Sequence, residues 1–536
     1  MTIALRPRVY SPNILVEQSR RAGITGETAM AYENLQLFLA ALEKNGEMRR
    51  IKAPVDPVLE VAEITDRISK SPTRSGKYPA AGAAPFGPPN PRFGTGAYNQ
   101  ALLFENVKGS DIPLAINTFG SYERLQMALG CESLDQLAER IAEMTRPEMP
   151  TRLLDKLRKG WDLLKLAGYT PKVRPGAALC QEVVHTDDAD LTRLPIIQCW
   201  PKDGGKYITF GQVVTAHPQT GARNLGMYRV QIFDKKLAAM HWHMHHDGAR
   251  HFRAWAKLSQ PCPLAIALGG ESVLPYAATA PLPAGMDEHV FAGFLLGRGL
   301  ELTACKTIPL EVPVNTEIVI EGFVDPVQTI LEGPFGDHTG FYSLADQYPV
   351  FRVTAITHRK NPVYPTTIVG KPPQEDFYLG KATERIFLPL LRMIVPDIID
   401  YDLPMFGVFH NCAVVKIHKE YPYHARKVIY AIWGAGQMAW TKMVIVVDAH
   451  VDVHNLDDVL FHVAANVDPQ RDTFIVQGPL DILDHAAPAM GAGGKMGIDA
   501  TRKWPGEGVV RDWPEELVMD EATLATVTRR WKEYGF

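Results

Sequence analysis

One stretch of the chain, Asn224 to Asp247, gathers side chains that bind ions and move protons. An amide and a guanidinium stand five positions apart, and four imidazoles follow a lysine-rich turn: Asn224, Arg229, His241, His243, His245 and His246. Amide oxygens and imidazole nitrogens are metal ligands, and a guanidinium pairs with anions. Histidines on an edge strand are also commonly just solvated, so the pattern is compatible with a ligand-binding cleft and with an ordinary polar face.

Three carboxylates outside this stretch could complete such a site. Glu288 stands near the start of a helix predicted within residues 284–294, where a carboxylate usually pairs with the helix dipole but can also bind a metal. Glu332 and Asp337 flank a Gly-Pro-Phe-Gly turn. Two carboxylates on a rigid turn suit proton transfer, although turn carboxylates that only accept backbone hydrogen bonds are equally common.

A β-hairpin is predicted to position the histidine-rich stretch. Two β-like runs, residues 227–233 and 237–245, flank the lysine-rich turn. Side chains alternate along a strand. The alternation predicts two opposite faces. One face carries His241, His243 and His245, and the other carries Trp242, Met244 and His246.

Composition sets the class of protein. The chain has 536 residues, 46% hydrophobic and 22% charged, which is typical of a globular protein of about two to four domains. Its net charge of −4 gives no electrostatic reason to expect nucleic acid. The six cysteines form no CxxC pair, which favours reduced thiols over a cysteine-ligated metal. No apolar run approaches the ~18–20 residues that span a bilayer, so we expect a cytoplasmic protein, at most peripheral to the inner membrane.

An N-terminal α/β domain is predicted over residues 33–178. The preceding residues 1–32 lack the apolar core of a signal peptide and are predicted to be a disordered extension. Residues 71–96, rich in Pro, Gly and Ala, are predicted to be a surface insertion. The predicted elements are a strand over residues 101–104 and helices within residues 33–51, 55–68, 121–144 and 151–166.

A central β domain, a barrel or sandwich, is predicted over residues 179–372, because short β-branched runs alternate there with Gly and Pro. The histidine-rich hairpin lies inside it. The other predicted strands cover residues 181–184, 207–216, 264–268, 307–322 and 351–357.

A separate C-terminal α/β domain is predicted over residues 373–536. Residues 491–499, GAGGKMGID, satisfy no phosphate-loop pattern and are predicted to be a flexible closing loop. The predicted elements are strands over residues 412–418 and 442–448, and helices over residues 383–394, 423–433 and 456–465.

Six separated segments together resemble, in sequence and in order, the UbiD family of decarboxylases. The resemblance begins at about residue 33 and runs to the C-terminus, and it is closest to the polyprenyl-hydroxybenzoate branch of ubiquinone biosynthesis. It implies a split β-barrel that binds a flavin, flanked by two α/β domains. The segments are LPIIQCWPKDGG (194–205), NLGMYR (224–229), the region of His245, the turn of Glu288, EGPFGDHTGFY (332–342) and KMGIDATRKWPGE (495–507).

The resemblance implies prenylated FMN with a divalent ion, Mn²⁺ or Mg²⁺, at its phosphate, and K⁺ as a further cation. Carried over by position, the metal ligands are Asn224, His245 and Glu288. This oxygen-rich shell suits Mn²⁺ or Mg²⁺ better than Zn²⁺. The implied cofactor contacts are Met227, Tyr228, Arg229, His241, Trp242, His243, His246 and Asp247, with Lys427 at the phosphate.

The implied reaction is non-oxidative decarboxylation of an aromatic acid. In it Arg229 pairs with the substrate carboxylate, Glu332 holds that arginine, and Asp337 protonates the ring carbon after CO₂ has left. Family members that act on acrylic acids often have Glu where this chain has Asp337, so the aspartate favours a hydroxybenzoate. His241 and His243 stand where the closest members have Arg and Leu. The loss of the arginine charge weakens the inference that His241 contacts the flavin.

The expected substrate is 3-polyprenyl-4-hydroxybenzoate, converted to 2-polyprenylphenol, with a small phenolic or heteroaromatic acid as the alternative. A prenyl-FMN synthase would supply the cofactor, and the C-terminal domain would join copies into a homo-oligomer, a dimer or a hexamer. Two other classes stay open. A histidine-metal hydrolase would bind stoichiometric zinc without flavin, and in a non-catalytic flavin carrier CO₂ release would not follow the flavin-loaded fraction.

Overall fold

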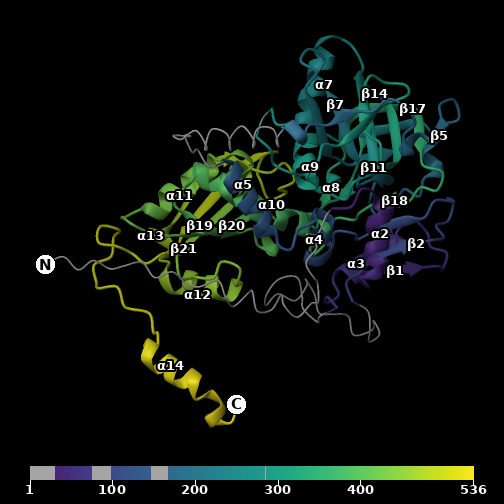
Figure 1. The fold of residues 1–536 in the computed structure, drawn as a ribbon. Coiled ribbons are helices and arrows are strands. Elements are labelled where there is room, and N and C mark those ends of the chain that lie inside the picture. Colours follow the sequence, from purple (N-terminus) through teal and green to yellow (C-terminus); the bar gives the residue numbers. More distant parts are fainter. Residues whose placement is uncertain (1–30, 75–97, 146–166, 245, 284) are drawn as a thin grey trace, which may run out of the picture.

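The computed structural model describes residues 31–74, 98–145, 167–244, 246–283 and 285–536. Most of the predicted extension and insertion, the helix predicted over residues 151–166, and His245 lie outside the described residues. Figure 1 shows most N-terminal elements in purple and blue beside a central sheet in teal, and C-terminal elements in green and yellow, among which the blue helix α5 (Leu134–Thr145) lies next to α10 (Glu375–Ile394).

The first helices form where hydrophobic periodicity predicts them. Helix α2 (Leu35–Lys44) begins where the Asn34 side chain accepts a hydrogen bond from a backbone amide, and it buries the predicted apolar face. Strand β1 (Met48–Ile51) follows after Gly46, whose φ of +73° suits glycine. Helix α3 (Glu60–Ser69) begins later than predicted, because residues 55–58 form β-bridges with Val107 and Gln198 instead.

The N-terminal sheet has the strand order β1-β2-β3-β18. Strand β2 (Ala101–Phe104) has the predicted bounds, and all four of its residues are buried. Strand β3 (Leu114–Ile116) pairs in parallel with β18 (Tyr364–Pro365), so the chain returns to this sheet after crossing the central one.

The single helix predicted over residues 121–144 is two helices. Gly130 adopts a φ of +64° and ends α4 (Tyr122–Leu129), and α5 (Leu134–Thr145) begins four residues later. The apolar periodicity therefore identified the helical residues but not the break between them.

The nine-stranded central sheet carries the histidine-rich stretch. Its strands pair in the order β6-β9-β10-β17-β14-β11-β7-β8, and β5 pairs with β17. Among the described residues the pairing does not return from β8 to β6, so the split β-barrel stays a prediction. The strands are β5 (Val183–His185), β6 (Lys206–Ile208), β7 (Gln212–Ala216), β8 (Arg223–Met227), β9 (Val230–Ile232), β10 (Leu237–Met240), β11 (Cys262–Gly269), β14 (Thr316–Glu332) and β17 (Asp346–His358).

The predicted hairpin is present, with shorter strands. Strands β9 and β10 pair antiparallel, but Met227 belongs to β8, which pairs with β7 instead. Strand β10 ends at Met240, so the prediction that a strand carries His241 and His243 is wrong. Those side chains lie in the connection to helix α7 (Asp247–Lys257).

Two other predicted strands are each divided. The run 207–216 breaks between β6 and β7 at Gly211, where an added Cβ would lie 2.5 Å from the Ile266 side chain. The run 307–322 becomes β13 and β14, and β14 extends to Glu332. The remaining elements of this region are β4 (Lys172–Val173), β12 (Glu301–Ala304), β13 (Glu311–Pro313), β15 (Phe335–Gly336), β16 (Tyr342–Ser343), α8 (Leu274–Ala277) and α9 (Glu288–Leu296).

The C-terminal sheet has the order β19-β20-β21-β23-β22, with β20, β21 and β23 parallel. The alternation of strand and helix is as predicted. The elements are β19 (Ile398–Asp402), β20 (Cys412–Ile417), β21 (Met443–Asp448), β22 (Thr473–Pro479), β23 (Ala492–Asp499), α11 (His424–Trp433), α12 (Leu456–Asn466), α13 (Pro469–Asp472) and α14 (Glu521–Arg529).

The prediction of a flexible loop over residues 491–499 is wrong, because residues 492–499 form strand β23 inside the sheet. Glycine is needed there for close packing. A Cβ on Gly497 would lie 2.6 Å from the ring of Phe474, and one on Gly493 would lie 2.8 Å from Leu480. A glycine-rich strand has few side chains that reveal its period, so it looks like a loop in the sequence.

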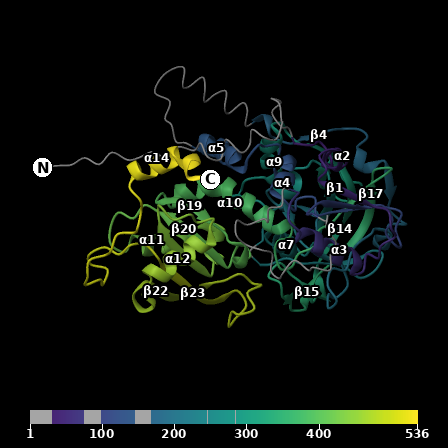
Figure 2. The ribbon, with the colours of Figure 1, turned by 90° about the horizontal axis from the view of Figure 1, so that it is seen from below.

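Helix α10 (Glu375–Ile394) joins the domains. It begins before the predicted Thr383, and Glu375 accepts hydrogen bonds from the backbone amides of Asn117 (3.0 Å) and Phe119 (2.9 Å). In both Figure 1 and Figure 2 it lies between the C-terminal elements and the rest of the chain. Within the described residues, no helix has the length and apolar character to cross a membrane.

We predict that Gly497→Ala lowers the melting temperature, because Phe474 cannot easily yield to the new methyl group. The Phe474 ring is held by Tyr430 and Trp433, at centroid distances of 5.3 and 5.8 Å. Overpacking of this kind costs about 1–3 kcal/mol. Gly434→Ala is the control, since its nearest neighbour would lie at an ordinary 3.5 Å. Equal melting temperatures for the two variants would contradict the packing argument.

Candidate active site

Strand β8 and the starts of α7 and α9 surround a cavity of about 500 Å³. Asn224, Asp247 and Glu288 line it, together with the cationic side chains Arg223 and Arg250. Two predicted metal ligands, Asn224 and Glu288, therefore share one cavity, whereas the third, His245, lies outside the described residues.

The donor atoms in this cavity fit a hard divalent cation. Burial, together with the neighbouring charges of Asp287 and Asp247, raises the pKa of Glu288 to about 7. One carboxylate oxygen of Glu288 accepts a hydrogen bond from the Leu225 amide at 3.0 Å. Asn224 lines the same cavity and adds an amide oxygen to the possible ligands. A cation bound to these oxygens would stabilise the ionised form of Glu288, which burial otherwise disfavours.

The residues predicted to contact the flavin form two adjoining segments. Met227 ends β8, and Tyr228 and Arg229 follow it directly. The Tyr228 ring lies 5.0 Å from His246 and 6.3 Å from Trp242, both measured between ring centroids. The described cofactor residues from the two sides of the hairpin are thus brought together, and their contacts with a flavin stay a prediction.

Arg229 is the centre of a buried ion-pair network. Its Nε donates to Glu332 at 2.9 Å, its Nη1 donates to Asp337, and its Nη2 donates to Ser343 at 3.0 Å. The guanidinium also lies 4.6 Å from the centroid of the Phe335 ring. The three residues predicted to perform the chemistry are therefore in direct contact, with at most 9% of any of their side chains exposed.

The network keeps both carboxylates ionised. Burial alone would raise the pKa of Asp337, but the hydrogen bond from His338 and the charge of Arg229 hold that pKa well below its usual range. Burial is likewise outweighed at Glu332, where His241 and Arg229 lower the pKa. Arg229 cannot be deprotonated in this setting, so the site holds one fixed cation between two anions.

His241 belongs to this network as well. Its Nδ1 lies 2.9 Å from Glu332, its Nε2 lies 2.9 Å from His243, and its ring stacks on Tyr348. Burial lowers the pKa of His241, which favours the neutral imidazole. The histidine that departs from the family pattern thus supports Glu332 through its ring.

Asp203, within the motif at residues 194–205, fixes the turn that carries Asp337. Its carboxylate accepts hydrogen bonds from the amides of Gly336 (2.7 Å), Trp200 (2.8 Å) and Cys199 (3.1 Å). The adjoining Gly204 lies so close that an added Cβ would be 2.3 Å from the Gly333 carbonyl oxygen. This motif therefore positions the acid-bearing turn.

Two histidines near Asp337 were not predicted from the sequence as site residues. His338 Nδ1 lies 2.8 Å from Asp337, and His338 Nε2 lies 2.7 Å from His410 Nε2. Burial and the neighbouring His338 lower the pKa of His410 to about 4. His338 could have been noticed beside Asp337, but His410 is 73 positions away from Asp337 and stands in no recognisable motif.

Lys427 does not join this site in the structure. It lies on α11, and its Nζ pairs with Asp397. Helix α11 lies apart from α7 in both views of the fold (Figures 1 and 2). Its predicted contact with a phosphate stays a prediction.

We predict that Arg229→Met destabilises the protein by about 3–5 kcal/mol, because two buried carboxylates lose their cation. Without that cation both pKa values are higher than in the native chain, so the native chain gains more stability than the variant as the pH rises. In the native chain the lowered pKa values add stability above about pH 4 that is lost in acid. The difference in melting temperature should therefore be larger at pH 8 than at pH 5. Arg352→Met, at an exposed arginine of β17, should show no such trend.

Several proteins are similar to this chain over nearly its whole length. An uncharacterized protein of Aquifex aeolicus is 47% identical over 505 residues, which is 94% of this chain and 99% of that protein. An uncharacterized protein of Archaeoglobus fulgidus is 46% identical over 507 residues, with the same coverage. Neither name assigns an activity.

Solved structures share the fold. The UbiD-class enzyme HmfF from Pelotomaculum thermopropionicum, in complex with FMN, is 28% identical with a TM-score of 0.72, over 90% of this chain and 98% of that one. The vanillic acid decarboxylase of Sedimentibacter hydroxybenzoicus in its closed form is 27% identical with a TM-score of 0.76, over 94% and 98%.

Family models cover the chain in three parts. They describe the N-terminal domain, the Rift-related domain and the C-terminal domain of 3-octaprenyl-4-hydroxybenzoate carboxy-lyase, and they match residues 39–144, 171–372 and 377–500. With these matches, and with the buried arginine between two carboxylates, the chain belongs to the UbiD family of carboxy-lyases.

Proposed function

We propose that the protein decarboxylates an aromatic carboxylic acid without net oxidation, using prenylated FMN and a divalent metal ion. The observation that carries the proposal is the buried guanidinium of Arg229 held between Glu332 and Asp337. The HmfF structures, one in complex with FMN and one with prFMN, support the choice of cofactor.

The cavity beside β8 would hold the metal and the cofactor phosphate. Asn224 and Glu288, with His245, would bind Mn²⁺ or Mg²⁺, and K⁺ would be a further cation at the cofactor. Arg223 and Arg250 line the same cavity and would balance phosphate charge. The bound prenylated flavin supplies an electron sink for the charge left on the ring carbon.

The protein groups would then control one carboxylate and one proton. A substrate carboxylate that binds Arg229 takes the place of Asp337 on the guanidinium. Asp337 then no longer contacts the positive charge of Arg229 that lowers its pKa, and burial favours its protonated form. After CO₂ has left, Asp337 delivers this proton to the ring carbon. Glu332 keeps its two contacts with Arg229 and so preserves the angle of the guanidinium.

His338 would supply the proton to Asp337. Although burial opposes it, the hydrogen bond with Asp337 and the charge of that residue raise the pKa of His338. An imidazolium 2.8 Å from the carboxylate can pass its proton when the pKa of Asp337 rises. His410, 2.7 Å beyond, would accept or restore that proton from the side of the C-terminal domain.

We propose a 4-hydroxybenzoate ring as the substrate core. The matching family models name 3-octaprenyl-4-hydroxybenzoate, and a solved relative acts on vanillic acid, which also carries a hydroxyl group para to the carboxylate. The polyprenylated acid is our first candidate, which would give 2-polyprenylphenol in ubiquinone biosynthesis. A small phenolic or heteroaromatic acid is the second. Homo-oligomerisation stays a prediction. Contact with a membrane surface stays a prediction for the polyprenylated substrate.

The test of the reaction uses protein co-expressed with a prenyl-FMN synthase. We expect CO₂ release from 3-polyprenyl-4-hydroxybenzoate, and a comparison with vanillate decides between the two substrate candidates. Protein made without the synthase should be folded but inactive. Turnover in that protein, which would hold ordinary FMN or no flavin, or no turnover of any aromatic acid by the loaded protein, would contradict the proposal.

Asp337→Asn should lower the rate of CO₂ release by about 10²- to 10⁴-fold, because the variant has no acid at the ring carbon. The same variant should fail to exchange deuterium from D₂O into the product ring, a reaction that needs the acid but no CO₂ release. Asp111→Asn, at an exposed aspartate between β2 and β3, is the matched control. Full exchange and turnover in Asp337→Asn would show that another group is the acid.

Asn224→Ala and Glu288→Gln should each lower the Mn²⁺ content per chain of the flavin-loaded protein, since the first removes an amide oxygen and the second removes the carboxylate charge. Elemental analysis after gel filtration measures this directly. Gln219→Ala, exposed on the turn between β7 and β8, should leave the content unchanged. Undiminished manganese in both cavity variants would refute the assignment of these ligands.

A further inference from the structure

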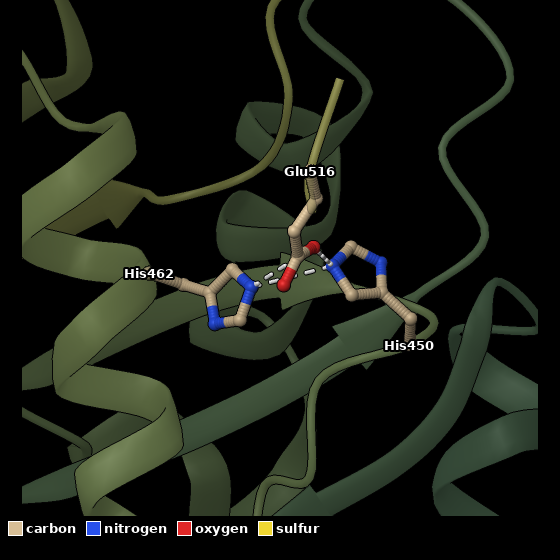
Figure 3. A group of neighbouring side chains, drawn as sticks. All are labelled: His450, His462 and Glu516. Carbon is tan, nitrogen blue, oxygen red and sulfur yellow. Dashed lines mark hydrogen bonds and ion pairs between the residues drawn. The ribbon is translucent and has the colours of Figure 1, made fainter. Parts of the chain in front are cut away.

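Two histidines and a glutamate converge on the C-terminal domain, far from the cavity beside β8. His450 lies in the turn after β21, His462 lies on α12, and Glu516 lies in the extended segment before α14. Figure 3 shows the three side chains pointing toward one another from these three elements. The two Nε2 atoms are 3.3 Å apart, and Glu516 Oε2 lies 2.9 Å from His450 Nε2 and 3.7 Å from His462 Nε2.

The tautomer of His462 directs a lone pair into this cluster. Its Nδ1 lies 2.9 Å from the carbonyl oxygen of Asp458, which can only accept, so Nδ1 carries the proton. In the neutral ring Nε2 therefore has a lone pair, aimed at His450 and Glu516. Such a hydrogen bond at the far nitrogen is the usual orientation of a metal-binding histidine. The His462 side chain is only 6% exposed, so its packing holds this direction.

The distances match a tetrahedral ion. A zinc-type ion about 2.0–2.1 Å from two imidazole nitrogens places those nitrogens about 3.3 Å apart. The three separations within the cluster lie around this value. His450 and Glu516 are each about half exposed, at 56% and 50%, so an ion and a water ligand can reach the cluster from solvent.

A second group of this kind, Glu384, Asp402 and His454, makes the contrast clear. There the ammonium group of Lys381 lies between the carboxylates, 2.5 Å from Glu384 and in contact with Asp402, and already supplies the cation. Within the described residues, Glu516 forms no ion pair with a lysine or an arginine, and it pairs with the two imidazoles.

We propose that His450, His462 and Glu516 bind one divalent transition-metal ion of the zinc type, with water as the fourth ligand. Two imidazoles and one carboxylate are a usual zinc donor set, unlike the oxygen-rich set around Glu288. The ion fixes the extended segment that carries Glu516 against α12. This site is structural and separate from the decarboxylation chemistry. Helix α14, which follows the segment and has no buried residue, lies away from the body of the molecule in Figure 1.

The experiment measures Zn²⁺ and Co²⁺ binding to the full chain after chelation and dialysis. We expect one Zn²⁺ per chain, and Co²⁺ in its place should give the strong visible absorption of a four-coordinate ion. His450→Gln and Glu516→Gln should each weaken Zn²⁺ binding at least tenfold and remove that absorption. Glu288→Gln should retain both, which separates this ion from the one proposed at the cofactor. His418→Gln, exposed at the end of β20, is the matched control.

Trypsin cleavage at the exposed Arg511 gives a second measurement. Zn²⁺ should slow this cleavage in the unmodified chain but not in His450→Gln, because the bound ion adds a tie between the segment and α12 that the variant lacks. Equal zinc content in the unmodified chain and both cluster variants, or absence of zinc binding by the unmodified chain, would overturn the proposal. The three side chains would then be a hydrogen-bonded triad only.

Discussion

The site depends on one constraint: a guanidinium buried between two carboxylates has to be held by everything around it. A buried ion pair gains little net stability, because desolvation offsets the attraction, but removal of one partner costs about 3–5 kcal/mol. Arg229 follows β8, whereas Glu332 ends β14 and Asp337 follows β15. The pairing can exist only when the central sheet has brought these segments together.

The hydrogen bonds around the pair have this positioning role. Asp203 binds three backbone amides and so fixes the turn that carries Asp337. Burial raises the pKa of Asp203 to about 6, although the amides oppose that shift. His241 supports Glu332 from the other side. Each carboxylate of the pair is therefore held by groups that do not themselves contact Arg229, which keeps the guanidinium oriented for another anion.

The sequence predicted much of this site because its residues stand in compact motifs. Asn224, Glu288, Arg229 and Asp337 could be named from short segments, and the structure gathers them at β8 and its neighbours. The sequence failed where packing decides the structure. The glycine-rich β23 looked like a loop, and β10 ended before the histidines, since a periodic pattern cannot show where pairing stops.

His410 shows why the remaining part of the site could not be predicted. It lies after β19 in the C-terminal region, yet its imidazole meets His338 beside the acid turn of the central sheet. Only the packing of one domain on another creates this contact, and α10 maintains it by joining its first turn to the N-terminal domain through Glu375. A shift of the C-terminal domain would separate His410 from His338 and change the surroundings of Asp337. The protonation of the acid and the arrangement of the domains are therefore coupled through two imidazoles.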